Sequence, residues 1–101
     1  MLNTPVLFLI FNRPDTTRQV FAKIREILPQ QLFIAADCPR ADRAGDNTLC
    51  TETKMIVEHI DWDCELHRLY ATENLGFSHR IKLALKWFFE NVELGIILED
   101  D

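Results

Sequence analysis

The stretch PVLFLIF, Pro5 to Phe11, decides the fold. It is a continuous apolar run that is bounded at its far end by Asn12-Arg13-Pro14. A strand with one face in water alternates apolar and polar residues, whereas a strand buried on both faces of a parallel sheet is apolar throughout. We therefore predict a strand of a parallel sheet here, covered on both sides.

A helix and a second strand follow. Apolar residues recur at helical spacing at Val20, Ile24, Ile27 and Leu28. Thr16 and Gln19 have the spacing of a capping box, and we expect Pro29 to end the helix. The apolar stretch QLFIAAD at residues 31–37 then predicts a second strand that ends in Asp37.

The rest of the chain repeats this order. A polar loop, CPRADRAGDN at residues 38–47, precedes a second helix. The apolar face of that helix is expected at Leu49, Thr53, Ile56 and Ile60.

A third strand, CELHRLYA, follows at residues 64–71. Gly76 then breaks the pattern before a third helix over residues 77–92. The apolar face of this helix is expected at Phe77, Ile81, Ala84, Leu85, Phe88 and Val92. LGIIL, residues 94–98, is the fourth strand.

Strands that alternate with helices of this length predict an α/β fold with right-handed crossovers. We expect a Rossmann-like three-layer sandwich with a four-stranded, mainly parallel sheet. Because 101 residues fit one domain and not two, residues 1–101 are predicted to form a single domain.

Composition excludes several classes of protein. Sixteen acidic residues against eleven basic ones give a net charge of −5, which argues against binding to nucleic-acid backbones. No apolar run approaches the ~20 residues that span a bilayer, and the first 14 residues lack the basic start of a signal peptide. The three cysteines form no CxxC pair, so we expect reduced thiols and a cytoplasmic location.

Polar residues gather where the predicted strands end. They are Asn12 and Arg13, then Asp37, and finally Glu99, Asp100 and Asp101. In parallel sheets ligands bind beyond the carboxyl ends of the strands, where the strand order reverses. The sequence therefore predicts a ligand site at this edge of the sheet.

The acidic triplet Glu99-Asp100-Asp101 suits Mg²⁺ or Mn²⁺, which prefer oxygen ligands. Alternation along a strand directs Glu99 and Asp101 to one face and Asp100 to the other. One carboxylate could then hold a metal while its neighbour accepts a hydrogen bond from a ribose hydroxyl. The alternative is a solvated acidic end of the chain.

The other polar residues each have two interpretations. Asp37 could accept a hydrogen bond from a base or a ribose, or it could be a turn or cap residue. Arg13 could bind a diphosphate, and Arg80, in the first turn of the last helix, could also meet an anion. Their alternative is that both are surface arginines.

Four segments together resemble the N-terminal, nucleotide-sugar-binding half of GT-A glycosyltransferases. PVLFLIFNRPDTTRQVFAKI is similar to the opening strand and helix, and FIAADCP to the second strand with its base-binding aspartate. ENLGFSHRIKLAL resembles a segment of inverting family-2 enzymes. IILEDD resembles the metal-binding DxD strand in the Glu-Asp-Asp form of N-acetylglucosaminyltransferase I.

The resemblance implies a role for each of seven residues. Nucleotide-binding residues would be Asn12, Arg13, Asp37, Arg80 and Asp100, with Asp37 on the base and Asp100 on the ribose. The metal ligands would be Asp101 and Glu99, the residue that begins the triplet. The catalytic residues lie outside the motifs that carry the resemblance.

The resemblance also implies an activity. A metal-dependent glycosyltransferase would take a nucleotide-diphospho sugar, a UDP-sugar in the first instance, and transfer the sugar to a hydroxyl of a glycan or other acceptor. A GT-A domain continues well beyond its DxD strand. We therefore expect this chain to be the N-terminal part of a longer domain, inactive alone, with an edge strand open to pairing with another copy.

A hypothesis from another class is a non-catalytic, flavodoxin-like or receiver-like domain whose acidic residues bind Mg²⁺. Receiver domains place an acid pair near the end of the first strand. This chain has Asn12-Arg13 there, which weakens the receiver-like version.

Overall fold

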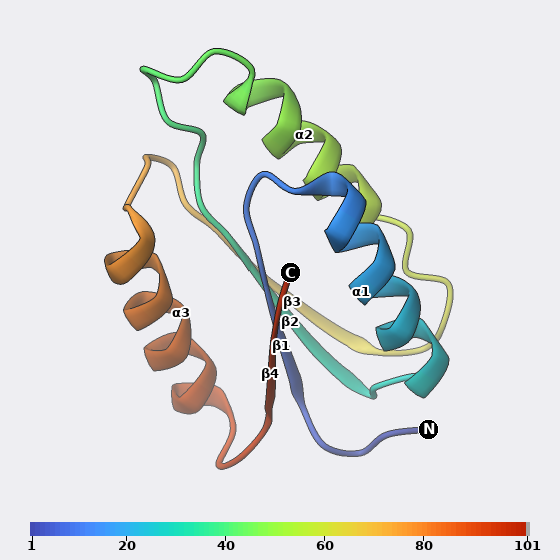
Figure 1. The fold of residues 1–101 in the computed structure, drawn as a ribbon. Coiled ribbons are helices and arrows are strands. Elements are labelled where there is room, and N and C mark those ends of the chain that lie inside the picture. Colours follow the sequence, from blue (N-terminus) through green and yellow to red (C-terminus); the bar gives the residue numbers. More distant parts are fainter. Residues whose placement is uncertain (101) are drawn as a thin grey trace.

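Strands and helices alternate along residues 1–100, the part of the chain that the computed structural model describes (Figure 1). The order is β1 (Val6–Ile10), α1 (Pro14–Ile27), β2 (Gln31–Ala36), α2 (Asp46–Ile56), β3 (Glu65–Tyr70), α3 (Phe77–Asn91) and β4 (Ile96–Glu99). The predicted α/β class and the predicted order of elements are confirmed.

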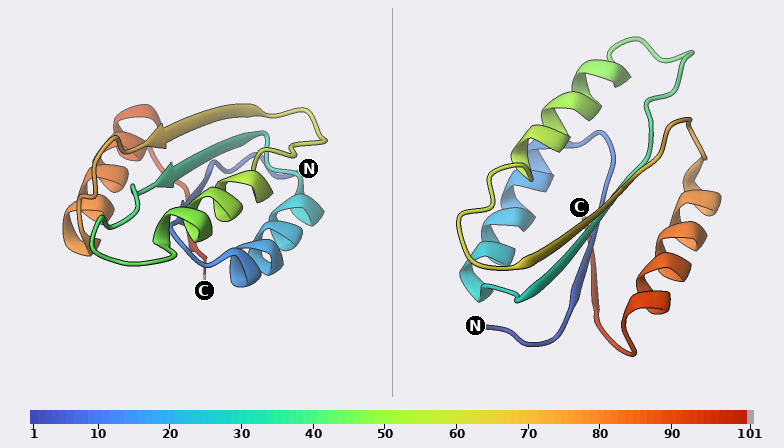
Figure 2. Two further views of the ribbon diagram at one scale, coloured as in Figure 1. Left: turned by 90° about the horizontal axis from the view of Figure 1, so that it is seen from above. Right: turned by 180° about the vertical axis from the view of Figure 1, so that it is seen from behind.

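The sheet is parallel throughout, with strand order β3-β2-β1-β4. Val6 at the start of β1 pairs with Leu32 of β2 on one side and with Ile96 of β4 on the other. Helices α1 and α2 lie together on one face, and α3 covers the opposite face (Figure 2). The three-layer sandwich is therefore confirmed, and the strand order reverses between β1 and β4.

Strand β1 contributes to both hydrophobic cores. Val6, Phe8 and Ile10 belong to the core under α1 and α2, and Leu7 and Leu9 belong to the core under α3. All five side chains are buried. This is the two-sided burial that the unbroken apolar run predicted.

The start of α1 differs from the prediction. The helix begins at Pro14, with Arg13 at the N-cap position and no side-chain cap, so the Thr16–Gln19 capping box is wrong. Proline fixes a helical φ and lacks the N–H that a first-turn residue would leave unpaired, which favours it at this position. Thr16 instead donates from Oγ1 to the Arg13 carbonyl at 3.4 Å. The helix ends before Pro29, as expected.

Helix α2 ends at Ile56, so the expected extension of its face to Ile60 is wrong. Its buried residues are Asp46, Cys50 and Thr53, whereas Leu49 is exposed. The buried Thr53 hydroxyl is satisfied because it donates to the Leu49 carbonyl at 2.7 Å.

Phe77 was expected on the buried face of α3 but is 66% exposed. It is the first residue of the helix, whose buried residues are Ala84 and Phe88. Gly95, just before β4, lets the ring of Phe88 from α3 lie close to the backbone. A Cβ there would collide with the Phe88 ring and lie 2.9 Å from the Pro5 carbonyl oxygen.

None of the helices within residues 1–100 is long and apolar enough to cross a membrane.

Candidate functional site

A cleft of about 670 Å³ lies at the carboxyl ends of β1 and β4, where the strand order reverses. Five of the predicted site residues line it: Asn12, Arg13, Arg80, Glu99 and Asp100. The loop after β2 adds Arg40 to its lining. Asp37 lies behind Arg80 and does not line the cleft, and Asp101 lies outside the described residues.

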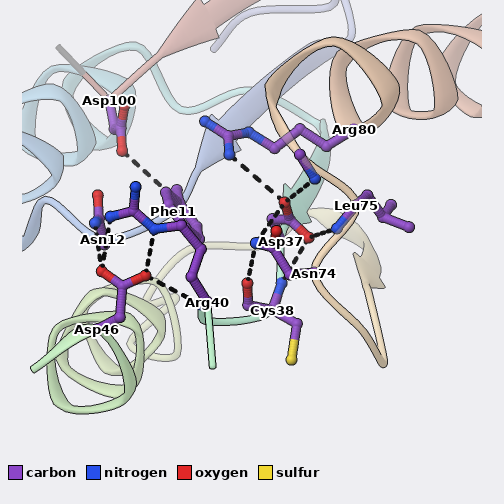
Figure 3. Close-up of polar contacts among 11 residues, drawn as sticks. Phe11, Asn12, Asp37, Cys38, Arg40, Asp46, Asn74, Leu75, Arg80 and Asp100 are labelled. Atoms are coloured by element: carbon purple, nitrogen blue, oxygen red, sulfur yellow. Dashed lines mark hydrogen bonds and ion pairs between the residues drawn. The ribbon is translucent and has the colours of Figure 1, made fainter. Parts of the chain in front are cut away.

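Asp37 joins the end of β2 to the loop between β3 and α3 (Figure 3). Its buried carboxylate accepts hydrogen bonds from the backbone N–H groups of Cys38 at 2.8 Å, Leu75 at 2.9 Å and Gly76 at 3.2 Å. The Asn74 amide donates to it at 3.3 Å. Loop donors therefore occupy this carboxylate, and a nucleotide base would have to replace one of them.

Arg80 is fixed by an anion and by aromatic rings. Its Nη1 lies 3.5 Å from Oδ2 of Asp37. Its guanidinium lies over the Phe11 ring, 4.4 Å from the centroid, and 5.2 Å from the centroid of Phe77. Such cation–π contacts orient a guanidinium that remains partly open to solvent. The exposed Phe77 is thus explained by its place beside Arg80.

The sequence interpretation missed Asp46 and Arg40. Asp46, at the start of α2, is 3% exposed and accepts from Arg40 through Nε at 2.8 Å, Nη2 at 3.1 Å and the backbone N–H at 3.0 Å. The Asn12 amide donates to it at 2.9 Å. These hydrogen bonds, those from Arg40 first, hold the pKa of the Asp46 carboxyl well below its ordinary range.

One feature of the sequence could have pointed to Asp46: an acidic residue in the first turn, here directly after Gly45, is typical of a helix start. Nothing in the polar loop sequence indicates that Arg40 reaches it. Asn12, which was expected to lie against a nucleotide, uses its amide to join the end of β1 to α2.

Asp100 connects β4 to β1. Its Oδ2 accepts a hydrogen bond from the Phe11 backbone N–H at 3.2 Å. Glu99 is exposed and lines the cleft beside it. Within residues 1–100 no three His, Cys, Asp or Glu side chains lie close enough together to hold a metal ion. The predicted metal ligand Asp101 is outside that range, so Glu99 and Asp100 are the described part of the triplet.

A second cavity of about 240 Å³ adjoins the cleft beneath the β3–α3 loop. Its lining is mostly apolar and includes Leu9, Ala35, Leu69 and Ala84. Arg80 lines both the polar cleft and the mostly apolar second cavity.

No family model, curated protein or solved structure matches this chain. The fold and the cleft define an α/β domain with a parallel sheet and a polar cleft at the reversal of strand order.

Proposed function

We propose that this chain is the nucleotide-binding part of a metal-dependent glycosyltransferase that takes a UDP-sugar and transfers the sugar to an acceptor hydroxyl. The observation that carries the proposal is the composition of the cleft at the reversal of strand order. Arg13, Arg40 and Arg80 line it together with Glu99 and Asp100. A cytoplasmic location belongs to the same proposal.

A nucleotide diphosphate suits this combination of charges. Guanidinium groups recognise phosphate oxygens, and carboxylates bind the divalent cations that accompany diphosphates. Glu99 carries the kind of oxygen donor that Mn²⁺ or Mg²⁺ prefers and would hold such an ion together with Asp101, while Asp100 would accept a hydrogen bond from the ribose. The ion would neutralise charge on the leaving diphosphate.

The strand order supports this hypothesis over a flavodoxin-like domain. Flavodoxin-like sheets have the order 2-1-3-4-5, whereas nucleotide-binding Rossmann sheets begin 3-2-1-4. The observed order, β3-β2-β1-β4, is the second of these. The strand order therefore favours the Rossmann-like hypothesis, and the titration described below tests the non-catalytic Mg²⁺-binding hypothesis.

The proposal is tested by titrating the chain with UDP, with and without Mn²⁺, and following the nucleotide by ligand-observed NMR. We expect binding that Mn²⁺ strengthens and that Asp101→Ala weakens. Glu93→Ala is the matched control, because Glu93 is an exposed acid outside the cleft. Binding of Mn²⁺ with no response to UDP would favour the Mg²⁺-binding module, and no response to either would contradict the proposal.

A further inference from the structure

Two arginines that meet at the cleft are each held by a buried aspartate. Arg40 comes from the loop after β2 and is bound by Asp46, and Arg80 comes from α3 and is bound by Asp37 (Figure 3). Both guanidinium groups lie over the ring of Phe11, at 5.5 Å and 4.4 Å from its centroid. Arginines from two separate segments thus converge at the end of β1.

Arg40 is fixed along one edge of its guanidinium. Nε and Nη2 donate to the two carboxylate oxygens of Asp46, and the Arg40 backbone N–H donates to the same residue. Asp46 is fixed in turn by Asn12. The remaining terminal nitrogen, Nη1, has no hydrogen-bond partner within residues 1–100, and the side chain is 36% exposed.

Arg80 has the same arrangement with a longer ion pair. Its Nη1 faces Asp37 at 3.5 Å, and its Nε and Nη2 have no partner in the described part of the chain. Arg40 thus uses one edge, and Arg80 one terminal nitrogen, for a buried carboxylate, and each keeps other N–H groups for the cleft. Side chains fixed in this way lose little conformational entropy when a ligand binds.

We propose that Arg40 and Arg80 form a phosphate site that binds the diphosphate directly, with Asp46 and Asp37 as positioning residues and without the need for a divalent cation. The identity of the ligand as a nucleotide diphosphate rests on the proposed function. The site itself is a property of the two arginines, because a diphosphate presents oxygens to more than one guanidinium at a time.

The charges of the cleft set a limit on the affinity of this site. Asp46 and Asp37 neutralise the two arginines, and Glu99 and Asp100 add negative charge at the other side of the cleft. The cleft therefore attracts an anion through directed N–H donors rather than through net charge. A cation bound by the acidic triplet would strengthen phosphate binding, but the arginines would determine where the phosphate lies.

The test is calorimetric titration of the chain with inorganic pyrophosphate, UDP and uridine in the presence of EDTA. For the wild type we expect pyrophosphate to bind and uridine alone to bind much more weakly. Arg40→Gln should weaken pyrophosphate binding by about tenfold or more, since it removes a charge-assisted hydrogen bond. Arg43→Gln is the matched control, because Arg43 is an exposed arginine of the same loop.

A second pair of variants separates positioning from charge. Asp46→Asn keeps the shape of the side chain but releases Arg40, so pyrophosphate binding should weaken although the net charge becomes more positive. If that variant fails to fold, Arg40→Lys gives the same information, since it keeps the charge at a partly exposed position and loses the planar fork.

Two outcomes overturn the inference. One is a wild type that does not bind pyrophosphate in EDTA; the other is pyrophosphate affinity in Arg40→Gln equal to that of Arg43→Gln. If UDP still binds with Mn²⁺ in either case, the proposed function survives without this site. If pyrophosphate binds as expected but UDP binds no more tightly, the site stands and the nucleotide assignment fails.

Discussion

At the scale of single residues, Asp37 is the clearest case of a polar side chain whose role depends on its burial. A carboxylate at the end of a strand suggested a contact with a ligand. The structure instead surrounds it with donors from the β3–α3 loop. These hydrogen bonds satisfy a buried carboxylate that would otherwise be costly, and they join the β3–α3 loop to the end of β2.

We predict that Asp37→Ala lowers the free energy of unfolding by about 3 kcal/mol or more, because it leaves buried N–H donors and the charge of Arg80 without a partner. Urea denaturation measures the change. Asp63→Ala is the control, because Asp63 is exposed and should change stability by less than about 0.5 kcal/mol. Equal stability of the two variants would show that the hydrogen bonds of Asp37 do not hold the loop.

At the scale of elements, the strands were the most predictable part of the sequence. The apolar runs at residues 5–11 and 31–37 are short, as buried strands are, and the first is bounded by prolines, so both favour buried strands over helices. Helix boundaries were less certain, since Pro14 and not Thr16 determines where α1 begins. The apolar period also continues past the true end of α2 to Ile60.

The site was predictable only as far as topology determines it. The strand ends of a parallel sheet must meet at one edge, and this placed Asn12, Arg13 and Asp100 at the cleft. The ion pair between Arg40 and Asp46 depends on the path of the loop between β2 and α2, residues 37–45, which no periodicity describes.

The contact between α3 and β4 depends on Gly95. We predict that Gly95→Ala lowers the free energy of unfolding by about 1–3 kcal/mol, because the added Cβ would collide with the buried ring of Phe88. The measurement is urea denaturation.

A double-mutant cycle with Phe88→Leu tests the cause of that loss. The smaller side chain should make room for the new methyl group, so the cost of Gly95→Ala should fall in the Phe88→Leu background. Costs that simply add would show that the loss comes from the contact with the Pro5 carbonyl oxygen and not from the ring.

At the scale of the whole molecule, the two edges of the sheet differ. The edge strand β3 carries Glu65, His67 and Arg68, and charged residues discourage pairing with another chain. The other edge strand, β4, carries Ile96 and Ile97, which are 38% and 41% exposed. The β4 edge is therefore the better surface for association between copies.

We predict that the chain self-associates through β4 and that Ile97→Lys shifts it toward the monomer. Light scattering coupled to size-exclusion chromatography, over a range of protein concentrations, measures the molar mass. Ile27→Lys is the matched control, because Ile27 at the end of α1 is 42% exposed and lies away from the sheet edge. A wild type that stays monomeric at every concentration would contradict the prediction.

The central position of β1 has a consequence for the protein during its synthesis. β1 leaves the ribosome before the other three strands, and β2 can cover one of its edges early. The other edge of β1 stays unpaired until β4, which begins at Ile96, has been synthesised. At roughly 5–20 residues per second, the synthesis of the intervening segment takes several seconds. The strand that organises the finished sheet is thus the one that a nascent chain exposes longest, and it is where we expect a chaperone to bind.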